Sequence, residues 1–176
     1  LIRSDQNLGY AGGINLGYQQ GLGRRGTYIL NPDAVPAPDS IRILLDIAEN
    51  DHSIGVVAPM IQSTDGQLKF SLRREPTLLR ALGEAVLGGH RAARFPMLGD
   101  MVRNPDAYHE GGSADWATGA ALFLPRRIID AVGTWDEQFF LYSEETDYAL
   151  RIRDIGYRLY FTPRATVQHP GGDMER

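Results

Sequence analysis

The sequence predicts an α/β fold in which helices cover both faces of a mostly parallel sheet. Short apolar runs, typical of buried strands, alternate with segments whose apolar residues recur at helical spacing. Polar residues with useful chemistry follow several of these strands directly. Because ligands of such sheets gather at the carboxyl ends of the strands, we expect a site along one edge of the sheet.

The expected strands are short runs of apolar and β-branched residues, bounded by turn-forming residues. Asn31-Pro32-Asp33 ends the first of them, because proline cannot continue a central ladder. Residues 64–67 are expected to form a hairpin tip, and residues 1–3 the tail of a further strand. In chain order the expected strands are 27–30, 54–60, 116–124, 158–161 and 165–168.

The expected helices combine apolar residues at helical spacing with capping residues. Asp39 or Ser40 is expected to cap the second helix, and Pro76 lies near the start of the third. Ser143 is expected to be the N-cap of the last helix, which Gly156 ends. In chain order the expected helices are 7–18, 41–50, 77–87, 126–132 and 144–155, with an irregular loop at 95–107.

Composition bounds the class of protein. The chain has 176 residues, of which 43% are hydrophobic and 23% charged, as expected for one domain, 1–176, with a real core. Its net charge of −4 gives no reason to expect a nucleic acid partner. The absence of cysteine excludes disulfides, thiolate metal sites and cysteine nucleophiles. No apolar run approaches the roughly 20 residues that a membrane span requires.

Three carboxylates stand within four positions, directly after the aromatic run 135–142. Glu144, Glu145 and Asp147 then fall in the first turn of the last helix, where exposed N–H groups favour negative charge. Acidic residues are common in a first turn, and Asp147 can pair with Arg151. This stretch by itself therefore leaves both a structural and a catalytic role open.

Two further polar residues follow expected strands. Asp33 comes directly after the strand 27–30, where its carboxylate suits a divalent cation or simply stabilises its own turn. His169 follows the last strand, where a neutral ring nitrogen can bind a metal or make an ordinary hydrogen bond.

Small and basic residues mark three other segments. The glycines of 9–13 fit neither a dinucleotide nor a Walker A motif, but they allow close approach of a ligand or of a helix. The small side chains of 116–121 leave room for a sugar or for tight packing. The segment 73–94 mixes leucines with arginines, so it can lie on an anionic membrane surface or form a solvated amphipathic helix.

Together these features resemble the family 2 glycosyltransferases with a GT-A fold, and within them the rhamnosyltransferase-like branch. The resemblance covers most of the chain, and the combination is more specific than any single motif. Its matching segments are 7–17, 28–33, 118–127, 132–147 and 169–172.

The resemblance implies a three-layer α/β/α sandwich and a set of roles. Asp33 stands at the family's DxD-type motif and would bind a divalent cation, Mg²⁺ or Mn²⁺, with His169 as its second protein ligand. Glu145 stands where the family usually has the aspartate that acts as general base, and Asp147 would support it. The residues expected to contact the donor are Gly12, Gly13, Asn15, Asn31, Thr118, Gly119 and Glu144.

The implied function is inverting, metal-dependent transfer of a sugar from a nucleotide-sugar donor, rhamnose from a dTDP donor, to a bacterial polysaccharide or lipid-linked acceptor. The alternatives are a UDP-hexose donor or a non-catalytic scaffold. The chain does not begin with Met, so we expect a piece of a longer protein that lacks its N-terminal strand and part of the nucleotide pocket, and that is a poor catalyst alone. The expected location is the cytoplasm, at the inner face of the membrane.

Overall fold

A six-stranded sheet runs through the computed structural model, which describes residues 2–21 and 23–170. Its strand order is β1-β7-β3-β8-β2, with β5 pairing with β8, and β1 is an edge strand. A separate pair of short strands, β4 and β6, lies beside it. The strands are β1 (Gly26–Leu30), β2 (Val35–Pro36), β3 (Ile54–Gln62), β4 (Leu72–Arg73), β5 (Gly112–Ala114), β6 (Trp116–Ala117), β7 (Ala121–Pro125) and β8 (Arg158–Gln168).

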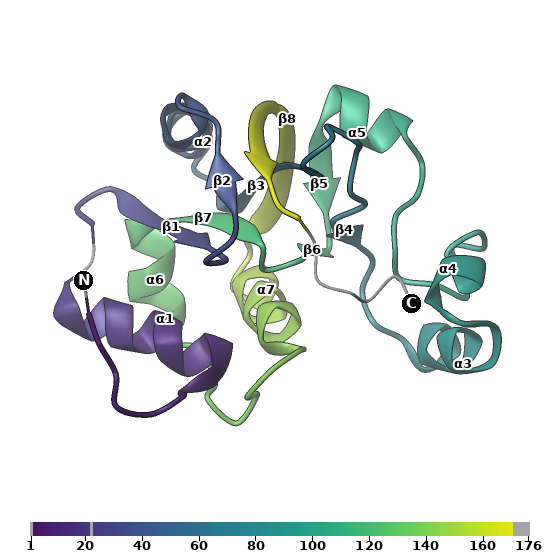
Figure 1. The fold of residues 1–176 in the computed structure, drawn as a ribbon, viewed down its shortest axis with the longest axis horizontal. Coiled ribbons are helices and arrows are strands. Elements are labelled where there is room, and N and C mark those ends of the chain that lie inside the picture. The colour runs from purple at the N-terminus through teal and green to yellow at the C-terminus, as the bar shows by residue number, and fades with distance from the viewer. Residues whose placement is uncertain (1, 22, 171–176) are drawn as a thin grey trace.

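Helices cover both faces of this sheet, which confirms the predicted α/β class. Figure 1 shows α2 on one side and α1, α6 and α7 on the other, with α3 and α4 at the far end of the molecule. The helices are α1 (Gly9–Gln20), α2 (Ser40–Asn50), α3 (Leu78–Leu87), α4 (Gly89–Ala92), α5 (Asp106–Glu110), α6 (Arg126–Val132) and α7 (Glu144–Asp154). In the part of the chain described, no helix is both long and apolar enough to cross a bilayer.

The sheet is mixed. Its longest pairing, between β3 and β8, is parallel, whereas β7 runs antiparallel between β1 and β3. The strands β1, β3 and β8 therefore point in the same direction, so the residues that follow β1 and β8 emerge at the same edge. This shared direction is what brings Asp33 and His169 to one place.

Two apolar layers hold the helices to the sheet. Leu44 of α2 packs with Val57 and Phe123 on one face, and Tyr148 and Ile152 of α7 belong to the larger core on the other. Val56 and Val57 alternate between the two faces, as in any strand, and the register shift between Ile54 and Val56 puts Ile54 in the same core as Val57. The shift coincides with Gly55, where a Cβ would lie 2.4 Å from Ile152.

Several expected elements differ in the structure. The expected strand 116–124 is two strands in different sheets, because residues 118–120 leave the β4–β6 pair before β7 begins. The two expected strands after Arg158 form the single strand β8, whose irregular register at Thr162–Thr166 absorbs the proline between them. Ile2 and Arg3 form no strand, and Leu1 lies outside the described residues. The elements that we did not expect are β2, β4, α4, α5 and β5.

Candidate functional site

Asp33 and His169 meet at the edge where β1 and β8 end. The Nε2 atom of His169 lies 3.1 Å from Oδ1 of Asp33, and the imidazole is largely buried while the carboxylate is half exposed. The backbone N–H of His169 donates to the carbonyl oxygen of Gln62 at 2.8 Å, which fixes the histidine to the end of β3. Asp33 and His169 therefore lie close together in space, as the sequence predicts.

The donor atoms of this pair fit a divalent cation. Asn31 Nδ2 also lies 3.1 Å from the same His169 ring nitrogen. A ring nitrogen has one lone pair, which either accepts from the Asn31 amide or binds a cation, so a cation shared with Asp33 would take the place of the Asn31 hydrogen bond. Neighbouring ligands of an octahedral ion at about 2.1 Å lie roughly 3 Å apart, close to the distance seen. Two protein donors leave most coordination positions to other oxygen ligands, and no group of three or more metal-binding side chains occurs among the described residues.

Glu145 is joined to this end of the sheet through the turn 118–120. The N–H of Gly119 lies 3.4 Å from Glu145 Oε1, and the N–H of Asn31 donates to the carbonyl oxygen of Ala120 at 3.0 Å. The N–H of Thr118 donates to the carbonyl oxygen of Ser71. Consecutive residues of one turn thus contact both Asn31 and Glu145, which puts the expected base beside the Asp33 edge.

Tyr10 completes this connection, and sequence reasoning missed it. Its hydroxyl donates a 2.5 Å hydrogen bond to the carbonyl oxygen of Gly119. Burial, and then the charges of Glu145 and Glu144, hold the pKa of Tyr10 well above its usual range, so the phenol stays protonated as a donor. A tyrosine among glycines has no distinctive pattern, so no signal in the sequence pointed to this role.

Glu144 precedes Glu145 at the start of α7, and its side chain is buried. Its Oε2 atom has no hydrogen-bond partner among the described residues. Burial, with a smaller contribution from the Glu145 charge, raises the pKa of this carboxyl. An unpartnered buried carboxylate oxygen destabilises a folded protein, which suggests a role for Glu144 beyond stabilising the first turn of α7.

The turn before α7 is strained. Tyr142 and Ser143 both have positive φ, 71° and 74°, in the left-handed region that non-glycine residues rarely adopt. Ser143 is the N-cap as predicted, and its carbonyl oxygen accepts the first helical hydrogen bond, from the N–H of Asp147, but its side chain makes no cap hydrogen bond. This left-handed turn comes directly before Glu144, the first residue of the helix that carries Glu145.

Asp147 faces away from Glu145. Its carboxylate forms a 2.8 Å ion pair with Arg151, whose guanidinium packs over Tyr148 and donates to the carbonyl oxygen of Thr134. It lines a shallow hollow together with Glu137, apart from the Asp33 edge. This geometry gives Asp147 a structural part in anchoring α7.

The glycine-rich stretch packs α1 against the loop before α7. A Cβ on Gly9 would lie 2.3 Å from the Phe140 carbonyl oxygen, and one on Gly12 would lie 2.8 Å from Leu8, the N-cap residue of the same helix. The buried Asn15 amide donates to the Trp135 carbonyl and to Glu137, and its oxygen accepts from the Trp135 N–H. Both amide hydrogens of Asn15 are used in hydrogen bonds within the protein. Asn15 therefore joins α1 to the loop before α7, in place of the expected contact with the nucleotide-sugar donor.

A cleft of about 620 Å³ lies between α1 and β1. Gly13 lines it as expected, and Asn31 stands at the end that leads to Asp33. Tyr10, Tyr28 and Phe140 supply aromatic walls that the sequence did not single out. The cleft is large enough for a small organic ligand, and Asn7, Thr27 and Asn31 are among its polar lining residues.

The fold and this site define a class: residues 3–172 match the family described as "Glycosyltransferase like family 2", and the chain belongs to that family. It is 30% identical, over 96% of its length, to N-acetylglucosaminyl-diphospho-decaprenol L-rhamnosyltransferase of Mycobacterium tuberculosis, and covers 58% of that protein. Within the family it is thus similar to a rhamnosyltransferase, in line with the resemblance seen in the sequence.

Two other curated relatives have different names. The hexosyltransferase Agl10 of low-salt glycan biosynthesis in Haloferax volcanii is 28% identical over 86% of this chain and 45% of its own length. Galactofuranosyltransferase GlfT1 of Mycolicibacterium smegmatis is 28% identical over 99% of this chain and 54% of its own. The chain thus spans about half the length of the curated relatives it matches.

A solved structure confirms the architecture. The crystal structure of GalNAc-T7 with UDP, GalNAc and Mn²⁺ superposes with a TM-score of 0.69 at 16% identity, covering 96% of this chain and 31% of that one. At this identity the likeness shows the GT-A-like fold alone.

Proposed function

We propose that this chain forms the catalytic part of an inverting, metal-dependent glycosyltransferase that moves rhamnose from a dTDP donor to a bacterial polysaccharide or lipid-linked acceptor. The observation that carries the proposal is the convergence of Asp33, His169 and Glu145 on one edge of the sheet, linked through Asn31 and Gly119. The rhamnosyltransferase relative supports the choice of sugar and of a lipid-linked acceptor. Such an acceptor would bring the protein to the inner face of the cell membrane.

Inverting transfer needs a base at the acceptor. The acceptor hydroxyl oxygen attacks the anomeric carbon, its proton passes to the Glu145 carboxylate, and the bond from the anomeric carbon to the diphosphate oxygen breaks. Glu145 lies in the first turn of α7, beside the exposed N–H groups of the helix N-terminus. The Gly119 N–H at 3.4 Å helps to orient it. This contact is long enough for the carboxylate to turn toward a hydroxyl.

The departing diphosphate needs a positive charge nearby to stabilise it. A divalent cation bound by Asp33 and His169 would act as a Lewis acid for the departing diphosphate. The His169 backbone N–H, bonded to the Gln62 carbonyl oxygen, holds the histidine in place. The cleft that Asn31 and Gly13 line would take up the remainder of the donor, together with Thr118 and Gly119. The packed residues Gly12 and Asn15 would contribute by fixing α1.

The test is Glu145→Gln in the complete protein. Loss of the base should lower turnover by roughly 10²- to 10⁴-fold, while calorimetric binding of dTDP with Mn²⁺ stays unchanged. Glu110→Gln, an exposed acid on α5, is the matched control and should keep full turnover. Unchanged turnover in Glu145→Gln would refute the base assignment, and equal loss of donor binding would reassign Glu145 to the donor site.

A second candidate, transfer from a UDP-hexose, is supported by the hexosyltransferase and galactofuranosyltransferase relatives. Competition between dTDP and UDP in the same titration separates the two. A third reading, a non-catalytic scaffold, requires that the complete protein shows no turnover with any donor and that Glu145→Gln changes nothing.

A further inference from the structure

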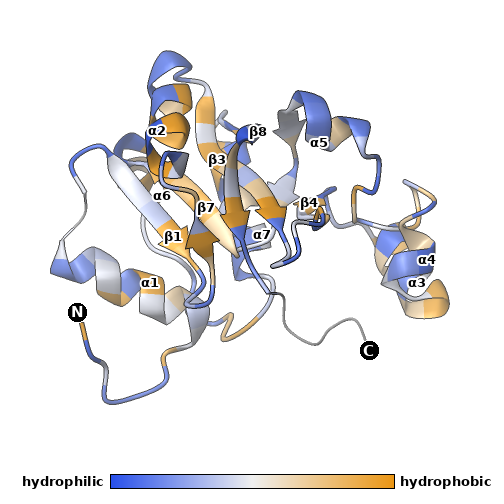
Figure 2. Ribbon diagram, turned by 45° about the horizontal axis from the view of Figure 1, so that its top comes forward, coloured by the Kyte–Doolittle hydropathy of each residue, from blue (hydrophilic) through white to orange (hydrophobic). Residues whose placement is uncertain are grey.

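Helix α3 presents an apolar stripe to solvent. Leu78, Leu82 and Val86 recur at helical spacing and are 92%, 61% and 72% exposed, and the alanines between them are exposed as well. Figure 2 shows this hydrophobic colouring on α3 at the end of the molecule remote from α1 and α2. Phe95 and Met97, in the loop after α4, are 56% and 70% exposed beside it. A contiguous exposed apolar surface of this kind marks an interaction site.

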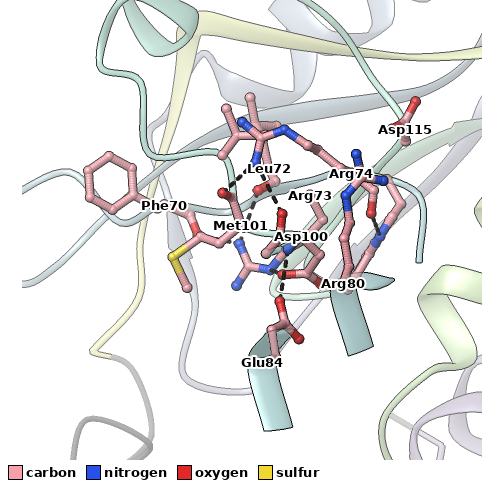
Figure 3. Close-up of polar contacts among 12 residues, drawn as sticks. Phe70, Leu72, Arg73, Arg74, Arg80, Glu84, Asp100, Met101 and Asp115 are labelled. Carbon is pink, nitrogen blue, oxygen red and sulfur yellow. Dashed lines mark hydrogen bonds and ion pairs between the residues drawn. The ribbon is translucent and has the colours of Figure 1, made fainter. Parts of the chain in front are cut away.

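The stripe is held outward by close packing on the opposite side of α3. Gly83 faces inward, and a Cβ there would lie 2.4 Å from the carbonyl oxygen of Leu98. The Glu84 carboxylate accepts the Asp100 N–H at 2.8 Å, and Arg80 donates to the carbonyl oxygen of Pro96. Figure 3 shows these polar side chains gathered at the base of the helix. The apolar residues therefore face solvent because the other side of the helix is already occupied.

The surroundings of the stripe are cationic. Residues 73–103 contain six arginines and three acids, a net charge of +3 in a chain whose total is −4. Arg91 and Arg94 follow α3 closely, are exposed, and make no ion pair within the described part of the chain. Apolar side chains flanked by unpaired arginines are the composition of a helix that lies in a membrane interface.

We propose that α3, α4 and the loop to Met97 form a docking surface for a bilayer that carries anionic headgroups. Leu78, Leu82 and Val86 enter the boundary between headgroups and acyl chains, and Arg91 and Arg94 contact lipid phosphates. The positive charge of this segment, opposite in sign to the chain as a whole, argues for an anionic lipid surface over a second copy of the chain. Docking here does not depend on the sugar transfer proposed above.

The experiment is flotation of the complete protein with two kinds of vesicle, one of phosphatidylcholine and one an equimolar mixture with phosphatidylglycerol. The wild type should float with the mixed vesicles and much less with the neutral ones. Because each arginine near an anionic surface contributes about a factor of five to partitioning, Arg91→Gln with Arg94→Gln should lower it by roughly 25-fold. Arg24→Gln with Arg164→Gln removes the same charge from exposed positions elsewhere and should have little effect.

The apolar contribution is tested separately. Leu82→Ser with Val86→Ser should abolish flotation, while Ile41→Ser on α2, also an exposed apolar residue, should not. Failure of the wild type to bind mixed vesicles, or equal losses in test and control variants, would overturn the proposal. A dimer in sedimentation that Leu82→Ser with Val86→Ser converts to a monomer would instead assign the stripe to a second copy. Since turnover is not the readout, none of these outcomes bears on Glu145.

Discussion

The hydroxyl of Tyr10 donates to the carbonyl oxygen of Gly119, while the N–H of the same glycine points at the Glu145 carboxylate. One residue of a turn thus receives a hydrogen bond from α1 and offers one to the first turn of α7. A Cβ on Gly119 would lie 2.6 Å from the Tyr10 hydroxyl oxygen, so a larger residue there would displace this hydroxyl. The position of the proposed base therefore depends on a helix that is distant in the chain.

Tyr10→Phe is expected to lower turnover more than stability. Removing the hydroxyl leaves a buried carbonyl without its partner, which costs about 1–3 kcal/mol, and frees the turn that orients Glu145. Tyr148→Phe is the matched control, because its hydroxyl donates to the Gly133 carbonyl at 2.9 Å, away from the turn. Thermal melts should show similar losses for both, and turnover should fall chiefly in Tyr10→Phe. Equal turnover in the two variants would argue against the link.

Asp33→Asn and His169→Gln are each expected to weaken binding of Mn²⁺ with nucleotide. Loss of a direct ligand should cost more than the roughly 10- to 100-fold that an outer-shell partner costs. Because both residues would serve one ion, the double variant should be little worse than either single one. Electron paramagnetic resonance of free Mn²⁺ measures this, with Asp65→Asn at the exposed hairpin tip as control. Independent, additive losses would mean that the two residues do not share a metal.

Glu144→Gln is expected to preserve the fold and impair the reaction. Burial raises the pKa of Glu144, so folding favours its protonated form; this stability is present below the ordinary value of 4.5 and is lost as pH rises through the raised value. The neutral amide removes that pH-dependent loss, so its melting temperature near neutral pH should equal or exceed the wild type's. Turnover should fall if the unpartnered Oε2 contacts the donor. A variant with full turnover would limit Glu144 to packing.

Asn15→Ala is expected to destabilise the protein without a specific effect on donor binding. The substitution removes hydrogen bonds to Trp135 and Glu137 in a buried site, each worth about 1 kcal/mol plus the cost of the groups left unpaired. Urea unfolding should show a large loss of stability, and the dTDP affinity of the folded fraction should be normal. A stable variant with weak dTDP binding would restore Asn15 to the donor site.

Asp100 gives the α3 region a pH dependence. Burial raises the pKa of Asp100 to about 6, with Glu84 adding to the effect and Arg73 opposing it. These residues lie together in Figure 3. Since the folded pKa exceeds the ordinary 3.8, the stabilising contribution is complete below that value and is lost as pH rises through about 6.

Hydrogen exchange of the α3 amides, corrected for intrinsic rates, should therefore show more protection near pH 5 than near pH 7. Asp100→Asn cannot ionise and should show much less of this difference. A wild type whose protection is flat over this range would rule out Asp100 as the titrating group. The control is Asp115→Asn, because the Asp115 carboxylate lies nearby and accepts the Glu75 N–H.

The fold was largely predictable because its main elements have strong local signals. β3 is a run of apolar residues, and Thr77 caps α3 by accepting the Arg80 N–H as a threonine should. The elements that escaped prediction depend on tertiary pairing. β5 has only small or polar residues and exists because it pairs with β8, and the separation of β6 from β7 depends on which strand each one meets.

The site was predictable where its polar residues directly follow the ends of strands. Asp33 and His169 were paired correctly because β1 and β8 point the same way. The outward direction of Asp147 and the packing role of Asn15 depend on how α1 and α7 are rotated against their neighbours, which spacing does not specify. Tyr10 was missed since a tyrosine among glycines carries no distinctive pattern until its carbonyl partner is known.

The left-handed turn at Tyr142 and Ser143 holds two residues in conformations that cost of order 1–3 kcal/mol each. We expect this segment to rearrange on heating before the sheet melts, because a strained conformation persists only while the surrounding contacts hold it. Because Glu145 follows it immediately, warming should disable the proposed base in molecules that are still folded. The temperature at which turnover declines would then fall below the temperature at which the protein unfolds.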